Sequence, residues 1–362
     1  EICWVQGPSP HTTESRFGAR RLAVVLKKSW PDFKGSNRKT QTHSPRRYFA
    51  LRRTKIDPMH SLTTRQWVLL VLLTLVWGLN WPVLKLGVTG YPPLTFRMLC
   101  LLIGTPILGL GLLAMKVPFR VPRQYWRELL VLAIFNMFIW HALIILAVQY
   151  LSSGRSAILG YTMPIFSALI GAFIFQNQLS KRAWGGVFAA ALGVLLLLWH
   201  ELSNLSGKPV GVLLALISAS TWALGTQLMR RTTIPLPTLT LSFWMTAMTT
   251  LVMMVLAFVF ESDRWQEPSP THWAAILFNA FLVFGFAHAA WFYLARGLPP
   301  VASTLSVMMI PILGVFSGAW ALNEILHWQD WAAMALMVVS IASVLWPSQA
   351  ASLAPAEDAK KA

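Results

Sequence analysis

Residues 67–86 read WVLLVLLTLVWGLNWPVLKL, and this stretch decides the class of fold. It has about the 20 residues that an α-helix needs to cross the hydrocarbon core of a bilayer. Its single charged residue, Lys85, stands one position before the end of the run. We therefore expect a membrane-spanning helix here.

Apolar runs of the same kind recur along the rest of the chain. Together with the first, the expected spans are 67–86, 94–115, 127–149, 156–175, 183–200, 209–229, 238–260, 272–295, 301–322 and 328–346. Short connections rich in proline, glycine and serine separate them, as turns do. The alternating segments of about ten residues that mark a β-barrel do not appear. The sequence predicts an all-α membrane protein with ten transmembrane helices.

The composition supports a membrane protein. Of the 362 residues, 56% are hydrophobic and only 12% are charged, against about 25% charged in an ordinary soluble domain. The net charge of +17 would suggest nucleic-acid binding in a soluble protein, but beyond residue 58 the basic residues lie mainly in short connections between apolar runs. We expect membrane lipid and no nucleic acid as a partner. The two cysteines and the absence of metal-ligand spacing predict no disulfide, no metal and no cofactor.

The two ends of the chain differ from the apolar part. Residues 1–58 are basic and show no hydrophobic periodicity, so we expect a disordered or non-native N-terminal extension. A lipid-binding tail and a targeting peptide are the alternatives. Residues 348–362 are expected to form a cytoplasmic tail.

The basic residues also predict the orientation. With the amino end inside, twelve Lys or Arg fall on the inner side and four on the outer side. The inner ones are Arg65, Lys116, Arg120, Arg123, Arg127, Lys181, Arg182, Arg230, Arg231, Arg296, Lys360 and Lys361, and the outer ones are Lys85, Arg155, Lys208 and Arg264. Because positive charge is enriched in cytoplasmic loops, we expect both termini in the cytoplasm.

The chain also repeats itself internally. At an offset of 147 residues the matched pairs include His141 with His288, Ser156 with Ser303, Pro164 with Pro311 and Trp184 with Trp331. At an offset of 145, Trp77 matches Trp222. We expect one five-helix repeat in residues 59–203 and a second in 204–347. Because five is odd, the second repeat must be inverted in the membrane, an arrangement that serves alternating access in carriers.

Several motifs then resemble one family. The segment Trp77-Gly78-Leu79-Asn80-Trp81-Pro82 resembles the first-helix signature of the EamA family of the drug/metabolite transporter superfamily. Residues 92–97, ending in Arg97, resemble the family's entry into the second helix, and Asn323-Glu324 resembles the end of its ninth. The similarity covers about residues 62–347. It departs from the family at Asn177, where an acidic residue often ends the fourth helix.

The resemblance implies a transporter of amino acids, other small metabolites or toxic compounds in the bacterial inner membrane. We predict a secondary transporter that exports amino acids or related small metabolites by alternating access. Efflux of cationic drugs is one alternative, and a non-transporting lipid-handling or structural membrane protein is another. The chain has no P-loop, rhomboid-type serine turn or carboxylate pair deep in a span, so no enzyme is predicted. Proton coupling and a homodimer stay open.

Polar residues inside spans are the candidates for contact with a small-molecule substrate, since they are costly in hydrocarbon. Arg97 suits a substrate carboxylate, with snorkelling to the membrane interface as the alternative. The matched pair His141 and His288 could carry protons or be hydrogen-bonded core residues. The full set of substrate-path candidates is Trp77, Asn80, Arg97, His141, Pro164, His288 and Pro311.

Two further residues lie near predicted helix ends. We expect Glu324 to cap or orient the turn before the tenth helix, with coupling as the alternative, and Lys85 to be an interfacial anchor. Pro164 and Pro311 are expected to break hydrogen bonding in their helices. The predicted central cavity is lined by the first, third, fourth, sixth, eighth and ninth spans.

Overall fold

The computed structural model describes residues 63–203, 209–294 and 300–345, all of which are helices or connections between helices without a strand. The expected N-terminal extension and C-terminal tail lie outside these residues. Within the described parts of the chain, nine segments are long and apolar enough to cross a membrane, and Ser306–Leu322 is a shorter apolar helix. These findings confirm an all-helical, multi-pass membrane protein.

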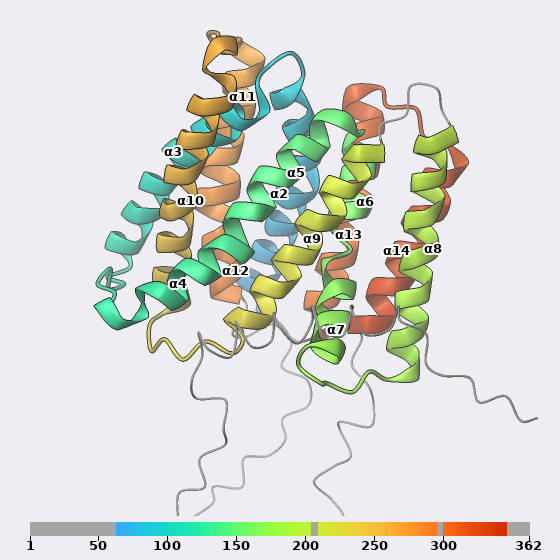
Figure 1. Ribbon diagram of the computed structural model, residues 1–362, viewed down its shortest axis with the longest axis horizontal. Helices are drawn as coiled ribbons and strands as arrows, with labels where there is room; N and C mark the ends of the chain where they lie inside the picture. Colours follow the sequence, from blue (N-terminus) through green and yellow to red (C-terminus); the bar gives the residue numbers. More distant parts are fainter. Residues whose placement is uncertain (1–62, 204–208, 295–299, 346–362) are drawn as a thin grey trace, which may run out of the picture. The chain divides into compact units, whose positions relative to one another are not determined.

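Seven of the expected spans are single helices in the described residues (Figure 1). They are α2 (Thr64–Val88), α3 (Pro93–Ala114), α8 (Lys181–Ser203), α9 (Pro209–Met229), α10 (Thr238–Glu261), α13 (Pro300–Leu322) and α14 (Trp328–Leu345). A short 3₁₀ turn, η3 (Ser262–Arg264), follows α10. Their bounds agree with the expected spans to within a few residues.

Two expected spans contain π-helical segments that periodicity does not predict. The expected span 127–149 consists of η1 (Arg123–Tyr125), α4 (Trp126–Ala133), the π segment η2 (Ile134–Phe138) and α5 (Ile139–Tyr150). The expected span 272–295 consists of α11 (Pro270–Leu277), the π segment η4 (Phe278–Ala287) and α12 (His288–Leu294). Residues 281–285, which lie 147 positions after η2, fall inside η4, so both π segments occupy matched positions of the repeat.

The two matched prolines have different effects on their helices. The expected span 156–175 is broken at Tyr161 and Thr162 into α6 (Ser153–Gly160) and α7 (Met163–Phe173). Pro164 stands in the first turn of α7, where its missing N–H costs nothing. Pro311 lies inside α13, which continues through it, so this proline removes one backbone hydrogen bond without ending the helix.

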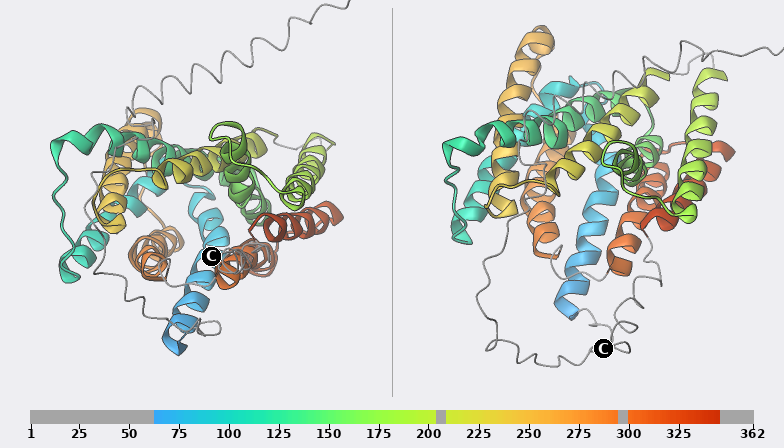
Figure 2. Two further views of the ribbon diagram at one scale, coloured as in Figure 1. Left: turned by 90° about the horizontal axis from the view of Figure 1, so that it is seen from below. Right: turned by 60° about the horizontal axis from the view of Figure 1, so that its bottom comes forward.

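The helices pack mainly between the first and second halves of the described chain. The principal neighbours are α2 with α13, α5 with α9, α3 with α10, and α8 with α14, and the ribbon views show the last pair side by side (Figure 2). Small residues allow the close approaches: a methyl group on Gly314 of α13 would meet Ala157 of α6 and Trp81 of α2. Such small-residue contacts replace the hydrophobic driving force that helices lack in lipid.

Large apolar side chains cover much of the exposed surface. Phe258 and Val259 of α10 and Trp320 of α13 are exposed, the last to 86%. Soluble proteins rarely expose extended apolar patches. The surface therefore fits contact with lipid.

A substitution at Gly225 of α9 tests how closely α9 packs against η2. Alanine normally stabilises a helix by about 0.5–1 kcal/mol relative to glycine. At Gly225, however, the new methyl would lie 2.6 Å from the backbone N and Cα of Asn136, and overpacking of this kind costs about 1–3 kcal/mol. We expect Gly225→Ala to lower the thermal unfolding midpoint in detergent.

Gly111→Ala is the matched control, because no atom lies within 4 Å of its added methyl. We expect it to leave the midpoint unchanged or to raise it. Equal midpoints for the two variants would contradict the close packing of α9 against η2.

Candidate functional site

The start of α3 is held by a carboxylate from another helix. Glu261, at the end of α10, accepts hydrogen bonds from the backbone N–H of Leu94 (3.1 Å) and Thr95 (2.7 Å) and from the Thr95 hydroxyl (2.8 Å). The first N–H groups of a helix have no partner within it, and an anion there also interacts favourably with the helix dipole. Glu261 thereby fixes the first turn of α3. Arg97 is the fifth residue of this helix and directly follows that turn.

Arg97 is buried in the core between the helices. The residue is 2% exposed, so its side chain lies inside the bundle and not on its outer surface. Its Nε is enclosed and has no hydrogen-bond partner among the described residues. No ion pair within that part of the chain involves Arg97 either. A cation buried in this way is costly unless an anion neutralises it.

His141 and His288 both contact one phenylalanine ring. The ring of Phe284 in η4 lies 5.5 Å from that of His141 in α5 and 5.4 Å from that of His288 in α12. His141 is also close enough to Arg97 and His288 to interact with them electrostatically. The structure thus brings His141 and His288, which come from segments distant in sequence, to one phenylalanine ring, and Arg97 lies within electrostatic range of His141.

The two histidines differ in their hydrogen bonds. His288 Nδ1 lies 2.7 Å from the carbonyl oxygen of Val283, so the proton must be on Nδ1 in the neutral ring. Neither ring nitrogen of His141 has a partner among the described residues. His141 can therefore donate or accept a hydrogen bond that this part of the protein does not supply.

The buried and partly buried carboxylates of the described chain have other partners, and none of them forms a hydrogen bond or ion pair with Arg97 there; they are Glu128, Glu261, Glu324 and Asp330. Glu261 binds the start of α3, and Glu128 of α4 accepts from the hydroxyl of Thr232. Asp330 of α14 pairs with Arg155 at 2.7 Å. The cluster of Arg97, His141 and His288 is therefore rich in donors and suited to an anion.

Two tryptophan pairs join the first and second halves of the described chain. Trp77 of α2 lies 5.6 Å from Trp291 of α12, and Trp222 of α9 lies 5.2 Å from Trp140 of α5. Trp77 and Trp222 are matched by the repeat. The sequence identified Trp77 as a candidate but not Trp140 or Trp291. The only signal for these two residues was that the tryptophans they contact, Trp222 and Trp77, are matched by the repeat.

The other candidates make no hydrogen bond or ring contact with this cluster among the described residues. No hydrogen bond or ring contact within the described residues joins Asn80, Pro164 or Pro311 to Arg97 or either histidine. Asn80 resembles His141 in one respect, because its buried Oδ1 has no partner there. It remains a candidate for hydrogen bonding to a ligand.

Lys85, the predicted interfacial anchor, makes contacts with a second helix that the sequence did not predict. Its Nζ donates to the carbonyl oxygens of Val148 (2.9 Å), Gln149 (3.2 Å) and Leu151 (2.7 Å) at the end of α5. These carbonyls have no N–H partner in the next turn of their helix, and a cation compensates them. Lys85 thus ties the end of α2 to the end of α5.

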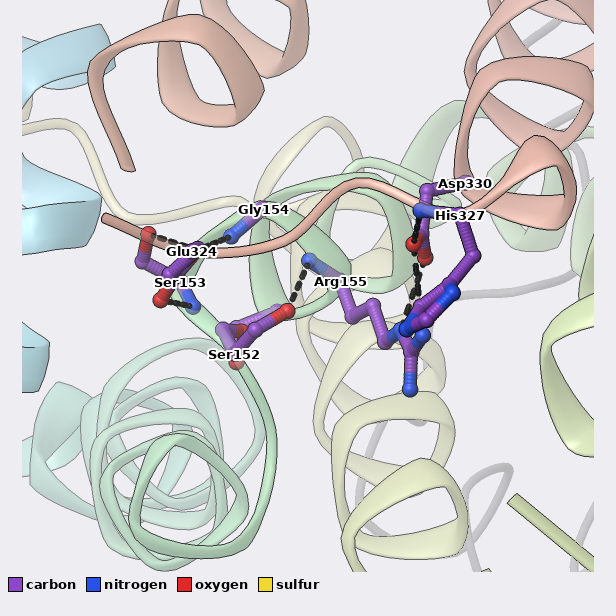
Figure 3. A network of polar contacts seen from close by, with 8 residues as sticks. Ser152, Ser153, Gly154, Arg155, Glu324, His327 and Asp330 are labelled. Carbon is purple, nitrogen blue, oxygen red and sulfur yellow. Dashed lines mark hydrogen bonds and ion pairs between the residues drawn. The ribbon is translucent and has the colours of Figure 1, made fainter. Parts of the chain in front are cut away.

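Glu324 caps a different helix from the one expected. Its carboxylate accepts from the N–H of Ser153 (2.6 Å), the Ser153 hydroxyl (2.8 Å) and the N–H of Gly154 (3.2 Å), at the start of α6 (Figure 3). The turn before α14 is instead capped by Asp330, which accepts from the N–H of His327 at 2.9 Å. Glu324 therefore joins the end of α13 to α6.

A cavity of about 270 Å³ lies between α2 and α13, and none of Arg97, His141 and His288 lines it. It is lined mainly by apolar side chains, and Thr74 and Ser306 in its wall are hydrogen-bonded to each other at 2.6 Å. None of the predicted substrate-path residues lines it. We do not assign it to transport.

Comparisons with known proteins agree with the resemblance seen in the sequence. The model of the EamA-like transporter family matches the chain twice, at residues 65–199 and 209–346. A Bacillus subtilis relative, "Uncharacterized transporter YoaV", is 24% identical over 70% of this chain and 88% of its own length. An Escherichia coli relative, "Uncharacterized inner membrane transporter YedA", is 25% identical over 75% and 88%.

Two further similarities concern function and fold. The "Probable amino-acid metabolite efflux pump" of Escherichia coli is 23% identical over 73% of this chain and 89% of that protein. A protein of known crystal structure is similar in fold, with a TM-score of 0.55 at 20% identity over 78% of this chain and 96% of that one.

The different hydrogen bonding of the two histidines predicts different effects on stability. His141→Leu removes two buried nitrogens that lack partners, so we expect the free energy of unfolding to stay constant or to rise. His288→Leu removes the hydrogen bond to Val283 and should lower it by about 1 kcal/mol. Thermal unfolding of both variants in detergent measures the difference, and equal destabilisation would show that His141 has a partner as well.

Proposed function

This chain belongs to the EamA-like transporter family, and from that premise we propose that it is a secondary transporter that exports amino acids or related carboxylate metabolites. Export proceeds by alternating access across the bacterial cytoplasmic membrane. Arg97, His141 and His288 bind the substrate, and the aromatic side chains near Trp77 border its path.

The buried guanidinium of Arg97 carries this proposal. Arg97 is 2% exposed, and no described carboxylate is its counter-ion. A substrate carboxylate would supply the missing charge and could form two parallel hydrogen bonds with the planar guanidinium. The same charge opposes a cationic drug, which would meet a buried positive group. We therefore favour carboxylate substrates over cationic ones.

The two histidines extend this site. His141 has two ring nitrogens without partners among the described residues, so it can bond to a substrate or to a proton. His288 is fixed by its hydrogen bond to Val283, and its ring stacks on that of Phe284. An imidazole nitrogen without a hydrogen-bond partner can accept a proton, and we propose that this pair couples transport to protons. Asn80 is the further candidate for a polar contact with the substrate.

Ten helices in two inverted repeats, 59–203 and 204–347, provide the mechanism. Three observations support this arrangement. The family model matches twice, the two π segments occupy matched positions, and Gln176 and Asn323, 147 positions apart, both have positive φ angles of 59° and 52°. Two similar halves can exchange conformations and so expose one site to each side in turn.

Relatives support the substrate class and the location. The matched proteins of Escherichia coli and Salmonella typhimurium are named as probable amino-acid metabolite efflux pumps, and another is named as an inner membrane transporter. We extend these properties to this chain, with both termini in the cytoplasm. A homodimer remains a prediction.

Arg97→Met tests the substrate class. It keeps a long side chain but removes the charge, so we expect loss of the stabilisation that a bound amino acid gives to the purified protein. At a concentration about 100 times the dissociation constant, that stabilisation is roughly 2.7 kcal/mol. The measurement is a thermal-shift screen with amino acids and with the corresponding amines that lack the carboxylate.

Arg120→Met is the matched control, since Arg120 is exposed and lies between α3 and η1. It should retain the stabilisation of the parent protein. Stabilisation of the parent by the amines alone would contradict the proposed role of Arg97 and favour cationic substrates. Uptake of a labelled amino acid into inverted vesicles then tests export directly.

A further inference from the structure

Helices α6 and α13 are joined by a carboxylate at one end of the helix bundle. Glu324 follows α13, and its two oxygens together accept three hydrogen bonds from Ser153 and Gly154 at the start of α6 (Figure 3). Hydrogen bonds to a charged group are roughly twice as strong as neutral ones. The positive end of the helix dipole adds to the attraction.

The loop that carries Glu324 also contacts two further helices. Asp330 of α14 accepts from the N–H of His327 and forms an ion pair with Arg155 of α6. The ring of His327 lies 4.6 Å from that of His200 in α8. This short loop therefore holds α6, α8, α13 and α14 together at the same end.

The matched loop at the opposite end of the bundle has the same backbone turn without the charge. Gln176 corresponds to Asn323, and both adopt positive φ angles. Asn177 corresponds to Glu324, but its N–H donates to the carbonyl oxygen of Gly171 in its own helix α7 (2.9 Å). No hydrogen bond from its side chain to another helix exists within the described residues.

Other contacts at this opposite end join a different pair of helices. Gln227 of α9 donates from Nε2 to the carbonyl oxygen (2.8 Å) and to the hydroxyl (2.9 Å) of Ser167 in α7. The guanidinium of Arg231 lies 3.8 Å from the ring centre of Phe175. These contacts hold α7 to α9, and no carboxylate contact between α7 and α13 occurs among the residues that the structure describes.

We propose that Glu324 is a positioning residue that latches the bundle end where α13 meets α6, and that the uncharged Asn177 makes the opposite end the easier one to open. The inference rests on the proposed alternating-access function. It specifies which contacts determine the side of the membrane to which the substrate site is open. Opening the Glu324 end requires the three hydrogen bonds to break. In the orientation predicted from the basic residues, the resting transporter then opens to the cytoplasm, which suits loading for export.

Accessibility of a cysteine at the latched end tests this proposal without any substrate. Ser156 of α6 is fully buried, one turn from the latch. The reporter is Ser156→Cys in the full chain with Cys3 and Cys100 replaced by alanine, reconstituted in vesicles. A membrane-impermeant maleimide should label it slowly. Glu324→Gln keeps the shape of the side chain and removes its charge, so it should raise the labelling rate about tenfold or more. A tenfold change corresponds to about 1.4 kcal/mol in the free energy of closing this end.

Glu261→Gln is the matched control, because Glu261 caps α3 at the same end with the same type of bonds. It should leave the labelling of Ser156→Cys unchanged. An equal rise in both variants would show general loosening of this end and overturn the specific role of Glu324. An unchanged rate in a folded Glu324→Gln protein would overturn the latch altogether.

Asn177→Glu provides a second test, which adds a charged group and does not remove any contact at the Glu324 end. A carboxylate there would strengthen closure of the opposite end and shift the population toward opening at the Glu324 end. We expect faster labelling of Ser156→Cys with an unchanged elution profile in size-exclusion chromatography. Slower or equal labelling would contradict the proposal. Because labelling requires no substrate, this result is independent of whether Arg97 binds a carboxylate.

Discussion

Charged side chains that complete the hydrogen bonding of helix ends hold this bundle together. A backbone N–H or C=O without a partner is costly where no water is available. Glu261 supplies acceptors for the start of α3, Glu324 for the start of α6, and Lys85 supplies donors for the end of α5. Each of these contacts links two helices. The same hydrogen bonds therefore complete the backbone hydrogen bonding of a helix end and hold that helix against its neighbour. The contacts of Glu261 and Glu324 join helices of the first half to helices of the second half. The contact of Lys85 joins two helices of the first half.

The fold was largely predictable from the sequence, because long apolar runs have few alternatives in a membrane. The expected span at 67–86 lies within α2, and the match of His141 with His288 led to two residues that the structure places around Phe284. The π segments could not be predicted, since a π turn arises from packing and leaves the hydropathy of the run unchanged.

The roles of the helix-end residues were harder to predict for a similar reason. Lys85 and Glu324 were correctly placed near helix ends, but their partners lie 63 and more residues away in the chain. Local reasoning therefore assigned Lys85 to the membrane interface and Glu324 to the adjacent turn. The burial of Arg97 was also ambiguous, because a position one turn inside a span is within reach of the interface for a long side chain.

The π segment η2 has a consequence for scanning experiments along the third span. An α-helix turns by about 100° per residue, and a π turn accommodates one extra residue before the α pattern resumes. Side chains in α5 are therefore rotated relative to the positions that a continuous helix from α4 would give them. A periodic profile of substitution effects should change phase between Ala133 and Ile139, and a single helical wheel drawn across this boundary would place His141 on the wrong face.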